Sequence, residues 1–582
     1  MATTSSTNSV ALDSVAARRY TVMTHRGIVS ALAAFALLVF SWRFAEIRPG
    51  ILLRPATADA IWDFARQLFP PDLSLEFLRT VLRATIQTMA TAVAGTLLSL
   101  AVALPLGVLA TGTLWNRGVL VAADNRFAYR ADWMASRLAR TLLGFLRAVP
   151  DLVWALLFVA AVGLGSLAGT LALAVAYSGV LGRVYADVFE DVDPQPLEAL
   201  QSTGATRMQI FLRGVWPQAR PHLVAYTLYS FECCVRAAAV LGFVGAGGIG
   251  YEISISMRLF EYGQVLTLLL VFILLLTVTD AASRYVRARF VGRATRVRRM
   301  PTRGRPSLRL LTNKSRKFVG WIAVLSLIVV SFAFAGFAPE TLIQAGIASR
   351  LANFVSRMLP MDLSWSFVSS LGTALLQTIA ISLMGTLAGV ALAVILAVPA
   401  TSTLTFVRRD SPGSHGLADR ALRWLLFWSA RLVLNILRSI PELVWVLICI
   451  VAVGIGPFAG TIALGLHTAG VLGKLYAETM EEVPLRPVEA LRSLGASPVQ
   501  LLLWAIWPQA RPLLSSYTVL RWETNLRAST ILGLVGGGGL GQAIYNNVQL
   551  GFYPRLTTLI LLIYALVLAS DWIGERLRLR VA

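Results

Sequence analysis

Long apolar segments recur along the whole chain and alternate with shorter polar stretches. A helix needs about 20 predominantly apolar residues to cross the hydrocarbon core of a bilayer. Because that core offers no water to the backbone, segments of this length and hydropathy are expected to be helices. The pattern predicts six spans in each half of the chain, twelve in all. The predicted spans are 28–46, 84–111, 141–163, 166–186, 223–244, 262–282, 318–337, 372–398, 440–455, 459–477, 514–535 and 556–573.

The composition excludes a string of soluble domains. A length of 582 residues would suggest about four such domains. However, only 14% of the residues are charged, whereas a soluble domain carries about 25%. The mean hydropathy of +0.69 agrees. We therefore expect an all-α polytopic membrane protein that uses the lipid bilayer as the solvent for most of its surface.

The chain is internally duplicated. Residues 143–167 (LGFLRAVPDLVWALLFVAAVGLGSL) align with residues 434–458 (LNILRSIPELVWVLICIVAVGIGPF). The same offset aligns residues 197–221 (LEALQSTGATRMQIFLRGVWPQARP) with residues 488–512 (VEALRSLGASPVQLLLWAIWPQARP). Each copy is far longer than a solenoid repeat. The sequence therefore predicts two copies of one membrane unit in a single chain.

A basic stretch between the copies, residues 284–317, holds 13 Lys and Arg and no acid, which is typical of a linker. The predicted organisation is thus a cytoplasmic tail (1–27), a first membrane half with six spans (28–283), this basic cytoplasmic linker, and a second membrane half with six spans (318–582).

The basic residues also predict the orientation. Lys and Arg concentrate in cytoplasmic loops, and one assignment places the tail, the linker, loops 112–140 and 399–434 and both termini in the cytoplasm. With six spans per half, the two halves enter the membrane in the same direction. They are then parallel repeats related by a pseudo-two-fold axis along the membrane normal. Residues 57–70 and 341–359 are expected to be short amphipathic helices at the outer surface.

The net charge of +22 is therefore interpreted as a topology signal and not as a nucleic-acid footprint. The three cysteines and four histidines are scattered along the chain. Their spacing predicts neither a disulfide framework nor a metal site.

A polar loop between the fourth and fifth spans occurs once in each half. It reads Glu-Ala-Leu, then three further residues, then Gly, with a Pro thirteen positions after that Gly. Glycine permits a left-handed turn that ends the first short helix. An amphipathic second helix follows, and the proline is expected to mark a break before the fifth span. The residues are Glu198, Ala199, Leu200, Gly204 and Pro217 in the first copy and Glu489, Ala490, Leu491, Gly495 and Pro508 in the second.

This pattern resembles the EAA coupling loop of bacterial ABC importer permeases. The resemblance implies that each loop docks into a groove on a cytosolic ATPase subunit, with its Glu facing that partner. The sequence departs from the motif where Leu replaces its second Ala, and where Trp216 and Trp507 replace the Leu that usually precedes Pro. The alternative is an ordinary surface loop, which repetition at a fixed spacing disfavours.

Glycine strings follow the fifth span of each half, with G-x-G-x-x-G spacing. No strand precedes them, no acid follows in a βαβ unit, and no Walker A motif is present, so we expect no ATP or other cofactor in this chain itself. Two compatible interpretations remain open: backbone flexibility at an outer gate and close packing between helices. The glycines are Gly245, Gly247, Gly250, Gly536, Gly538 and Gly541.

Charges inside predicted spans are candidate functional groups, because ionisable residues are costly at membrane depth. In span five a Glu and an Arg stand four residues apart, on one helical face. In span three an Arg precedes a Pro and an acid. Guanidiniums facing a central path would attract an oxyanion; alternatively, each Arg only neutralises its neighbouring Glu. The candidates for the translocation path are Glu232, Arg236, Glu523, Arg527, Arg147 and Arg438.

Three stretches resemble the phosphonate-importer permease family: FECCVRAAAVLGFVGAGGIG (231–250), WETNLRASTILGLVGGGGLG (522–541) and RSIPELVW (438–445). The resemblance covers roughly residues 70–285 and 360–580. The family normally has one unit per chain and dimerises, so this chain resembles two fused units and one copy is expected per complex. The implied fold is that of a type I ABC importer permease with two six-helix halves.

The resemblance also implies a function. The chain would be a non-enzymatic transport subunit of the bacterial inner membrane that imports phosphonate, phosphate or phosphite by alternating access. Two cytosolic ATPase subunits would bind ATP and Mg, and an extracytoplasmic binding protein would deliver the substrate. Closely similar motifs occur in methionine permeases, which is the main alternative. A secondary transporter driven by an ion gradient is a remote one.

Overall fold

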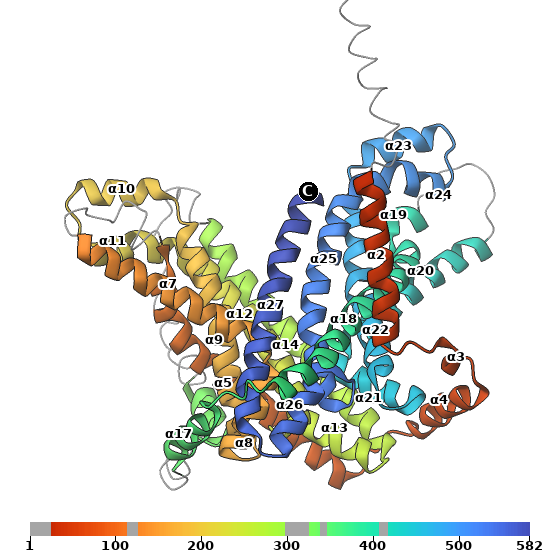
Figure 1. Ribbon diagram of the computed structural model, residues 1–582. Helices are drawn as coiled ribbons and strands as arrows, with labels where there is room; N and C mark the ends of the chain where they lie inside the picture. The colour runs from red at the N-terminus through yellow and green to blue at the C-terminus, as the bar shows by residue number, and fades with distance from the viewer. Residues whose placement is uncertain (1–24, 113–125, 297–324, 338–345, 407–416, 582) are drawn as a thin grey trace, which may run out of the picture.

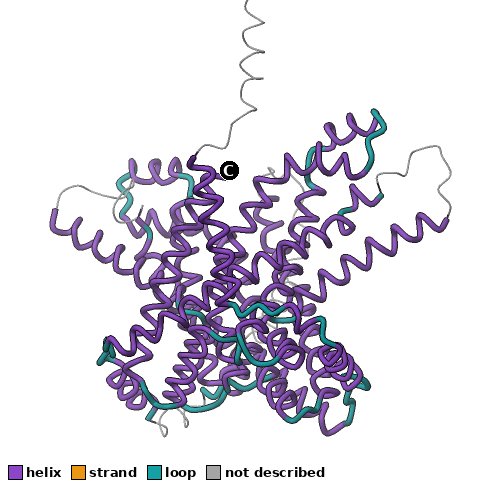
Figure 2. Tube along the Cα trace, turned by 45° about the vertical axis from the view of Figure 1, so that its right-hand side comes forward, coloured by secondary structure: helices purple, strands orange, loops and turns teal. Residues whose placement is uncertain are grey.

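The computed structural model describes residues 25–112, 126–296, 325–337, 346–406 and 417–581. Every regular element in these ranges is helical (Figure 2). The first half contains α2 (His25–Phe44), α3 (Pro49–Leu52), α4 (Pro55–Gln67), α5 (Leu75–Ala110), α7 (Arg126–Ala148), α8 (Asp151–Val162), α9 (Ser166–Glu190), α10 (Pro194–Ser202), α11 (Arg207–Ile210), a π-helical turn (Phe211–Val215), α12 (Trp216–Leu241), a 3-10 turn (Gly242–Val244), α13 (Ile249–Arg258) and α14 (Tyr262–Arg296).

The second half repeats this order. It contains an apolar helix (Leu325–Phe334), α17 (Ile347–Met358), α18 (Trp365–Ala400), α19 (Ser402–Thr405), α20 (Leu417–Ser439), α21 (Glu442–Val453), α22 (Pro457–Glu481), α23 (Leu485–Ser493), α24 (Pro498–Leu501), a π-helical turn (Leu502–Ile506), α25 (Trp507–Leu532), a 3-10 turn (Gly533–Val535), α26 (Gly539–Gln549) and α27 (Tyr553–Val581).

Each of the twelve predicted spans falls on a helix of the described part of the chain. Seven helices there are long and apolar enough to cross a membrane, or nine if each of two bent pairs is one span. The exceptions are α2, the helix Leu325–Phe334 and α25, which carries several charged residues. The count of twelve therefore stays a prediction. Two shorter helices, α4 and α17, lie where amphipathic outer helices were expected.

The third span of each half is broken, not continuous as 141–163 and 440–455 implied. The helix ending at Ala148 meets α8 at 87°, and the helix ending at Ser439 meets α21 at 99°. Pro150 and Pro441 stand at the breaks. Proline lacks an N–H donor and disfavours helical geometry in the residue before it. The bend therefore places Asp151 and Glu442 at the first positions of α8 and α21.

The first helix of each half packs on the other half. Helix α2 lies along α18, and α4 contacts α21 (Figure 1). Reciprocally, the Phe334 carbonyl accepts a hydrogen bond from Ser166 Oγ at 3.2 Å, and α17 contacts α8. This exchange joins the halves through helices that lie outside the central bundle.

The basic linker begins inside a helix. Helix α14 continues to Arg296, so residues 284–296 of the predicted linker are helical. The remainder of that linker, like most of the predicted 1–27 tail, lies outside the described residues. Arg287, one of the linker's basic residues, pairs with Glu232 at 2.8 Å. Part of the linker's positive charge thus compensates an acid of the membrane helices.

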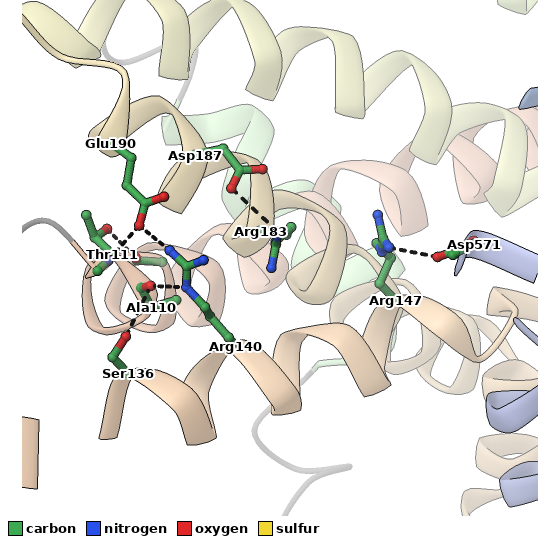
Figure 3. A network of polar contacts seen from close by, with 11 residues as sticks. Ala110, Thr111, Ser136, Arg140, Arg147, Arg183, Asp187, Glu190 and Asp571 are labelled. Carbon is green, nitrogen blue, oxygen red and sulfur yellow. Dashed lines mark hydrogen bonds and ion pairs between the residues drawn. The ribbon is translucent and has the colours of Figure 1, made fainter. Parts of the chain in front are cut away.

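An ion-pair clamp ties two helix ends to a third helix in each half. In the first half, Arg140 pairs with Glu190, and its Nε donates to the Ala110 carbonyl at 2.6 Å (Figure 3). In the second half, Arg431 pairs with Glu481 at 2.8 Å and donates to the Ala400 carbonyl. The clamp joins the C-terminal ends of α5 and α9 to the interior of α7, and those of α18 and α22 to the interior of α20, directly before the polar loop.

Candidate translocation path and coupling surfaces

The two polar loops lie at one end of the molecule. Helices α10 and α11 and helices α23 and α24 form two separate lobes at the end where the C-terminus also lies, whereas α13 and α26 lie at the opposite end (Figure 1). Glu198, Ala199, Glu489 and Ala490 are exposed on these lobes. Their arrangement presents two similar surfaces to the same side of the membrane domain.

Local contacts give each lobe a defined shape. Gly204 and Gly495 have φ of +77° and +80°, the left-handed geometry expected of a glycine that ends a helix. Thr206 and Ser497 then start the second helices with capping boxes. Leu197 packs toward Gly214 on the following π-helical turn. The face of the first helix that carries Glu198 or Glu489 is therefore exposed to solvent.

The prolines do not break the chain before the fifth span, as the sequence had suggested. Pro217 and Pro508 lie in the first turn of α12 and α25, which follow the π-helical turns directly. Gln218 donates its side-chain amide to the Gly214 carbonyl at 3.1 Å, and Gln509 donates to Ala505 at 2.7 Å. Each bond ties the first turn of the spanning helix to the π-helical turn of its lobe.

The glycine strings form tight, hydrogen-bonded turns at the other end. The N–H groups of Gly248 and Gly539 donate to Gln87 and Gln377, both at 3.2 Å. Gly245, Gly247, Gly536 and Gly538 have positive φ, whereas Gly250 and Gly541 lie in helices. A Cβ on Gly250 or Gly541 would collide with the carbonyl of Ala239 or Thr530. This geometry favours the packing interpretation; a gating role stays a prediction.

The alternative in which each Arg of span five neutralises the Glu four residues before it is not seen. Glu232 pairs with Arg287 of α14, and Glu523 pairs with Arg578 of α27. Arg527 pairs with Asp571 of α27 at 2.9 Å. The partners of these side chains therefore come from the neighbouring helix and not from the same helix four residues away.

A cross-half ion triad involves Asp571. Its second oxygen accepts from Arg147 of α7 at 3.0 Å, so one carboxylate joins Arg147 of the first half to Arg527 of the second (Figure 3). The equivalent triad of Arg438, Arg236 and Asp280 does not form. Among the described residues, Arg438 hydrogen-bonds only to Asn435, at 3.3 Å, and Asp280 makes no hydrogen bond or ion pair. The halves therefore differ in their contacts at the centre.

Sequence reasoning missed a polar cluster of the second half. His467 Nδ1 donates to the Ile440 carbonyl (3.0 Å), and its Nε2 lies 3.7 Å from Glu442. Arg521 Nε lies 3.5 Å from Thr468 Oγ1. Asn525, fully buried, bonds Thr468 and Thr386. A position-by-position comparison of the repeats could have found this cluster, because its polar residues have smaller, uncharged counterparts in the first half. The aligned pairs are Ala176 and His467, Ser230 and Arg521, and Cys234 and Asn525.

Within the described residues, no group of three or more His, Cys, Asp or Glu side chains is arranged to hold a metal ion. The chemistry of the centre is therefore that of guanidinium, carboxylate, imidazole and amide groups.

The family model named "Binding-protein-dependent transport system inner membrane component" matches residues 118–292 and 415–582, once in each half. The chain belongs to this family. It is an internally duplicated permease of an ABC importer, and its helices have the type I permease fold.

Two relatives and one solved structure put this permease in context. The "Phosphate-import permease protein PhnE" of Mycolicibacterium smegmatis is 31% identical over 524 residues, 89% of this chain and 90% of that protein. The "Phosphite transport system permease protein PtxC" of Stutzerimonas stutzeri is 34% identical and covers 45% of this chain with 90% of its own length. An inward-facing structure of the MetNI methionine ABC transporter is 24% identical, covers 38% of this chain and 100% of its own, and has a TM-score of 0.32.

The packing of the glycine strings is testable. Gly250→Ala or Gly541→Ala places a Cβ against a backbone carbonyl, so each should destabilise the permease by about 1–3 kcal/mol. The measurement is the thermal unfolding midpoint of the purified permease in detergent. Gly144→Ala, where a Cβ meets nothing within 4 Å, is the control and should leave the midpoint unchanged or slightly raised. Equal midpoints for all three variants would contradict the close approach.

The cross-half triad generates a second prediction. Asp571→Asn leaves Arg147 and Arg527 without their shared carboxylate, which should cost about 1–2 kcal/mol because the groups are partly exposed. The unfolding midpoint of the permease should fall. The matched variant Asp280→Asn removes a carboxylate that pairs with no described residue and should have little effect. A similar midpoint in both variants would argue against the triad as a stabilising contact.

Proposed function

We propose that this permease imports phosphate, phosphite or a phosphonate by ATP-driven alternating access. The observation that carries the substrate class is the similarity to a phosphate-import permease over both halves, 89% of the chain. The similarity to a phosphite permease over one unit supports it. The unpaired Arg236 of α12 supplies a group with suitable chemistry, since guanidinium binds phosphorus oxyanions through two parallel hydrogen bonds.

The two lobes formed by α10–α11 and α23–α24 serve, in this proposal, as docking sites for two cytosolic ATPase subunits that bind ATP and Mg. Exposed acids on both lobes and exposed apolar side chains beside them support this role, among them Met208 and Leu212 in the first lobe and Val499 and Trp504 in the second. With the lobes in the cytoplasm, the C-terminus lies there too, and a substrate-binding protein docks at the opposite, outer end.

Because the chain holds both halves, one copy per complex completes the transmembrane unit. The two lobes are not identical: Arg213 of the first matches Trp504 of the second. The two ATPase contacts are therefore inequivalent in this proposal.

The main alternative substrate is methionine, whose permeases carry similar loops and glycine strings. Methionine needs an apolar pocket for its thioether beside groups for its carboxylate and ammonium. The central residues described above are mostly charged or amide side chains, which favours a small oxyanion. A gradient-driven secondary transporter would have no use for two exposed coupling lobes.

Binding measurements test the substrate class. The binding protein encoded with this permease should give calorimetric binding to phosphate, phosphite or methylphosphonate, and the reconstituted complex should take up the same compound in an ATP-dependent manner. Methionine is the comparison ligand, and sulfate is the control for a tetrahedral oxyanion without phosphorus. The proposal would be refuted if the binding protein bound methionine and showed no binding to any of the three phosphorus compounds.

The coupling role of the lobes gives a further prediction. Glu198→Lys with Glu489→Lys reverses the charge on both exposed faces, so ATP-dependent uptake should fall at least about tenfold, as expected when an interface charge pair is disrupted. The measurement is uptake together with ATPase activity of the complex in proteoliposomes.

Glu575→Lys on α27 is the matched control, because it reverses one exposed acid that lies outside the two lobes. It should retain uptake. Normal assembly, ATP hydrolysis and uptake in the double Glu variant would show that these acids do not couple the ATPase.

A further inference from the structure

Two arginines inside the membrane helices lack a carboxylate partner in the described structure. Arg236, in the last two turns of α12, is exposed and makes no hydrogen bond or ion pair with a described residue. Arg521, on α25, makes a single weak hydrogen bond from Nε to Thr468 Oγ1 at 3.5 Å. The terminal nitrogens of both guanidiniums are therefore free to bind another group.

The two arginines lie where the halves meet. Val235, next to Arg236, belongs to the same buried apolar cluster as Leu443 of α21. Arg521 lies beside Thr468, and the neighbouring His467 lies 3.7 Å from Glu442 of α21. A guanidinium facing lipid would be costly. The electrostatic interactions of Arg236 with Glu442 and His467, and of Glu442 with Asp151 of the first half, agree with this placement.

The two cations stand at different depths. Arg521 aligns with Ser230 in the repeat, six residues before Arg236, which corresponds to about 9 Å along a helix axis. Arg236 lies nearer the end of α12 that leads to the glycine string. An anion entering from that end would meet Arg236 before Arg521.

The fifth span of each half has one arginine without a carboxylate partner among the described residues, and the repeats explain the difference in position. Arg527, which matches Arg236, is held by Asp571, and Ser230, which matches Arg521, carries no charge. Each half therefore contributes one available guanidinium, from non-equivalent positions. A symmetric dimer of either half would not have this arrangement.

We propose that Arg236 and Arg521 are two successive contacts for a tetrahedral phosphorus oxyanion as it crosses the permease. This assignment rests on the proposed function. Each guanidinium offers parallel N–H donors that match two oxygens of such an anion. His467 and Thr468 lie beside Arg521 and add hydrogen-bonding groups on the second-half side.

The two neighbouring acids are consistent with a site that binds the anion only weakly and then releases it. Asp151 and Glu442, at the first positions of α8 and α21, face the same region. Their negative charge offsets part of the attraction between two guanidiniums and an anion. Passage along a path requires binding that is favourable enough for entry but weak enough for exit, and several weak sites serve this better than one strong site. The combination of two cations and two acids meets that requirement.

The test uses the complete complex with its binding protein in proteoliposomes, supplied with radiolabelled phosphate and, separately, with phosphite and methylphosphonate. Arg521→Ser, which installs the residue found at the matching position of the first half, should lower uptake about tenfold, the usual effect of losing a charged hydrogen bond. Arg236→Gln should do the same. Arg521→Lys keeps the positive charge but lacks the two parallel N–H donors of a guanidinium. Its uptake should lie between that of Arg521→Ser and that of the unmodified permease. Binding-protein-stimulated ATP hydrolysis should persist in all three variants.

Ser230→Ala is the matched control, because it changes the equivalent position of α12 without altering charge, and it should transport normally. Uptake by Arg521→Ser and Arg236→Gln equal to that of the unmodified permease would overturn the proposal. The proposal would also be overturned if Arg521→Lys and Arg521→Ser lost uptake and stimulated ATP hydrolysis to the same extent. That result would show that Arg521 stabilises the structure and does not contact the anion. An unmodified complex that moves none of the three anions would instead refute the proposed function.

Discussion

The high cost of an unpaired charge in a low-dielectric membrane domain is the constraint on which this structure depends. It explains why Glu523 reaches Arg578 of the next helix and why Asp571 serves two arginines at once. The same cost explains the clamps of Arg140 with Glu190 and of Arg431 with Glu481 at the helix ends. Against this background, Arg236 and Arg521 are exceptions to the pairing seen for Arg527, because neither forms an ion pair with a described residue.

Duplication gave the protein two copies of every element, and the structure uses the copies differently. The clamps, the capped lobes and the glycine turns are present in both halves, with nearly the same hydrogen bonds. The centre is not symmetric. One triad is closed around Asp571, and its counterpart around Asp280 is open. Fusing two units into one chain permits this divergence, because each position in the second copy can change independently of the first.

The path and the lobes are mechanically connected. Each lobe follows the clamp at one of its ends and passes through a π-helical turn into the fifth spanning helix at the other. The fifth helix carries Arg236 in one half and Arg521 in the other. Each lobe and the residues at the centre thus share one continuous helix, and the glycine turn holds the far end of that helix against Gln87 or Gln377. In the proposed function, a movement imposed on a lobe by an ATPase subunit would pass along this helix.

The sequence by itself determined the membrane class, the duplication, the helical segments and the position of the two lobes, because hydropathy, period and motif spacing are local properties of the chain. It also pointed to Arg236 as a group at membrane depth. Only the tertiary structure decided which charges pair. Glu232 and Arg236 share a helical face, yet Glu232 binds Arg287, and Arg147 meets Asp571 across more than 400 residues of chain. Those choices depend on the rotation and exchange of packed helices from both halves, which no local pattern records.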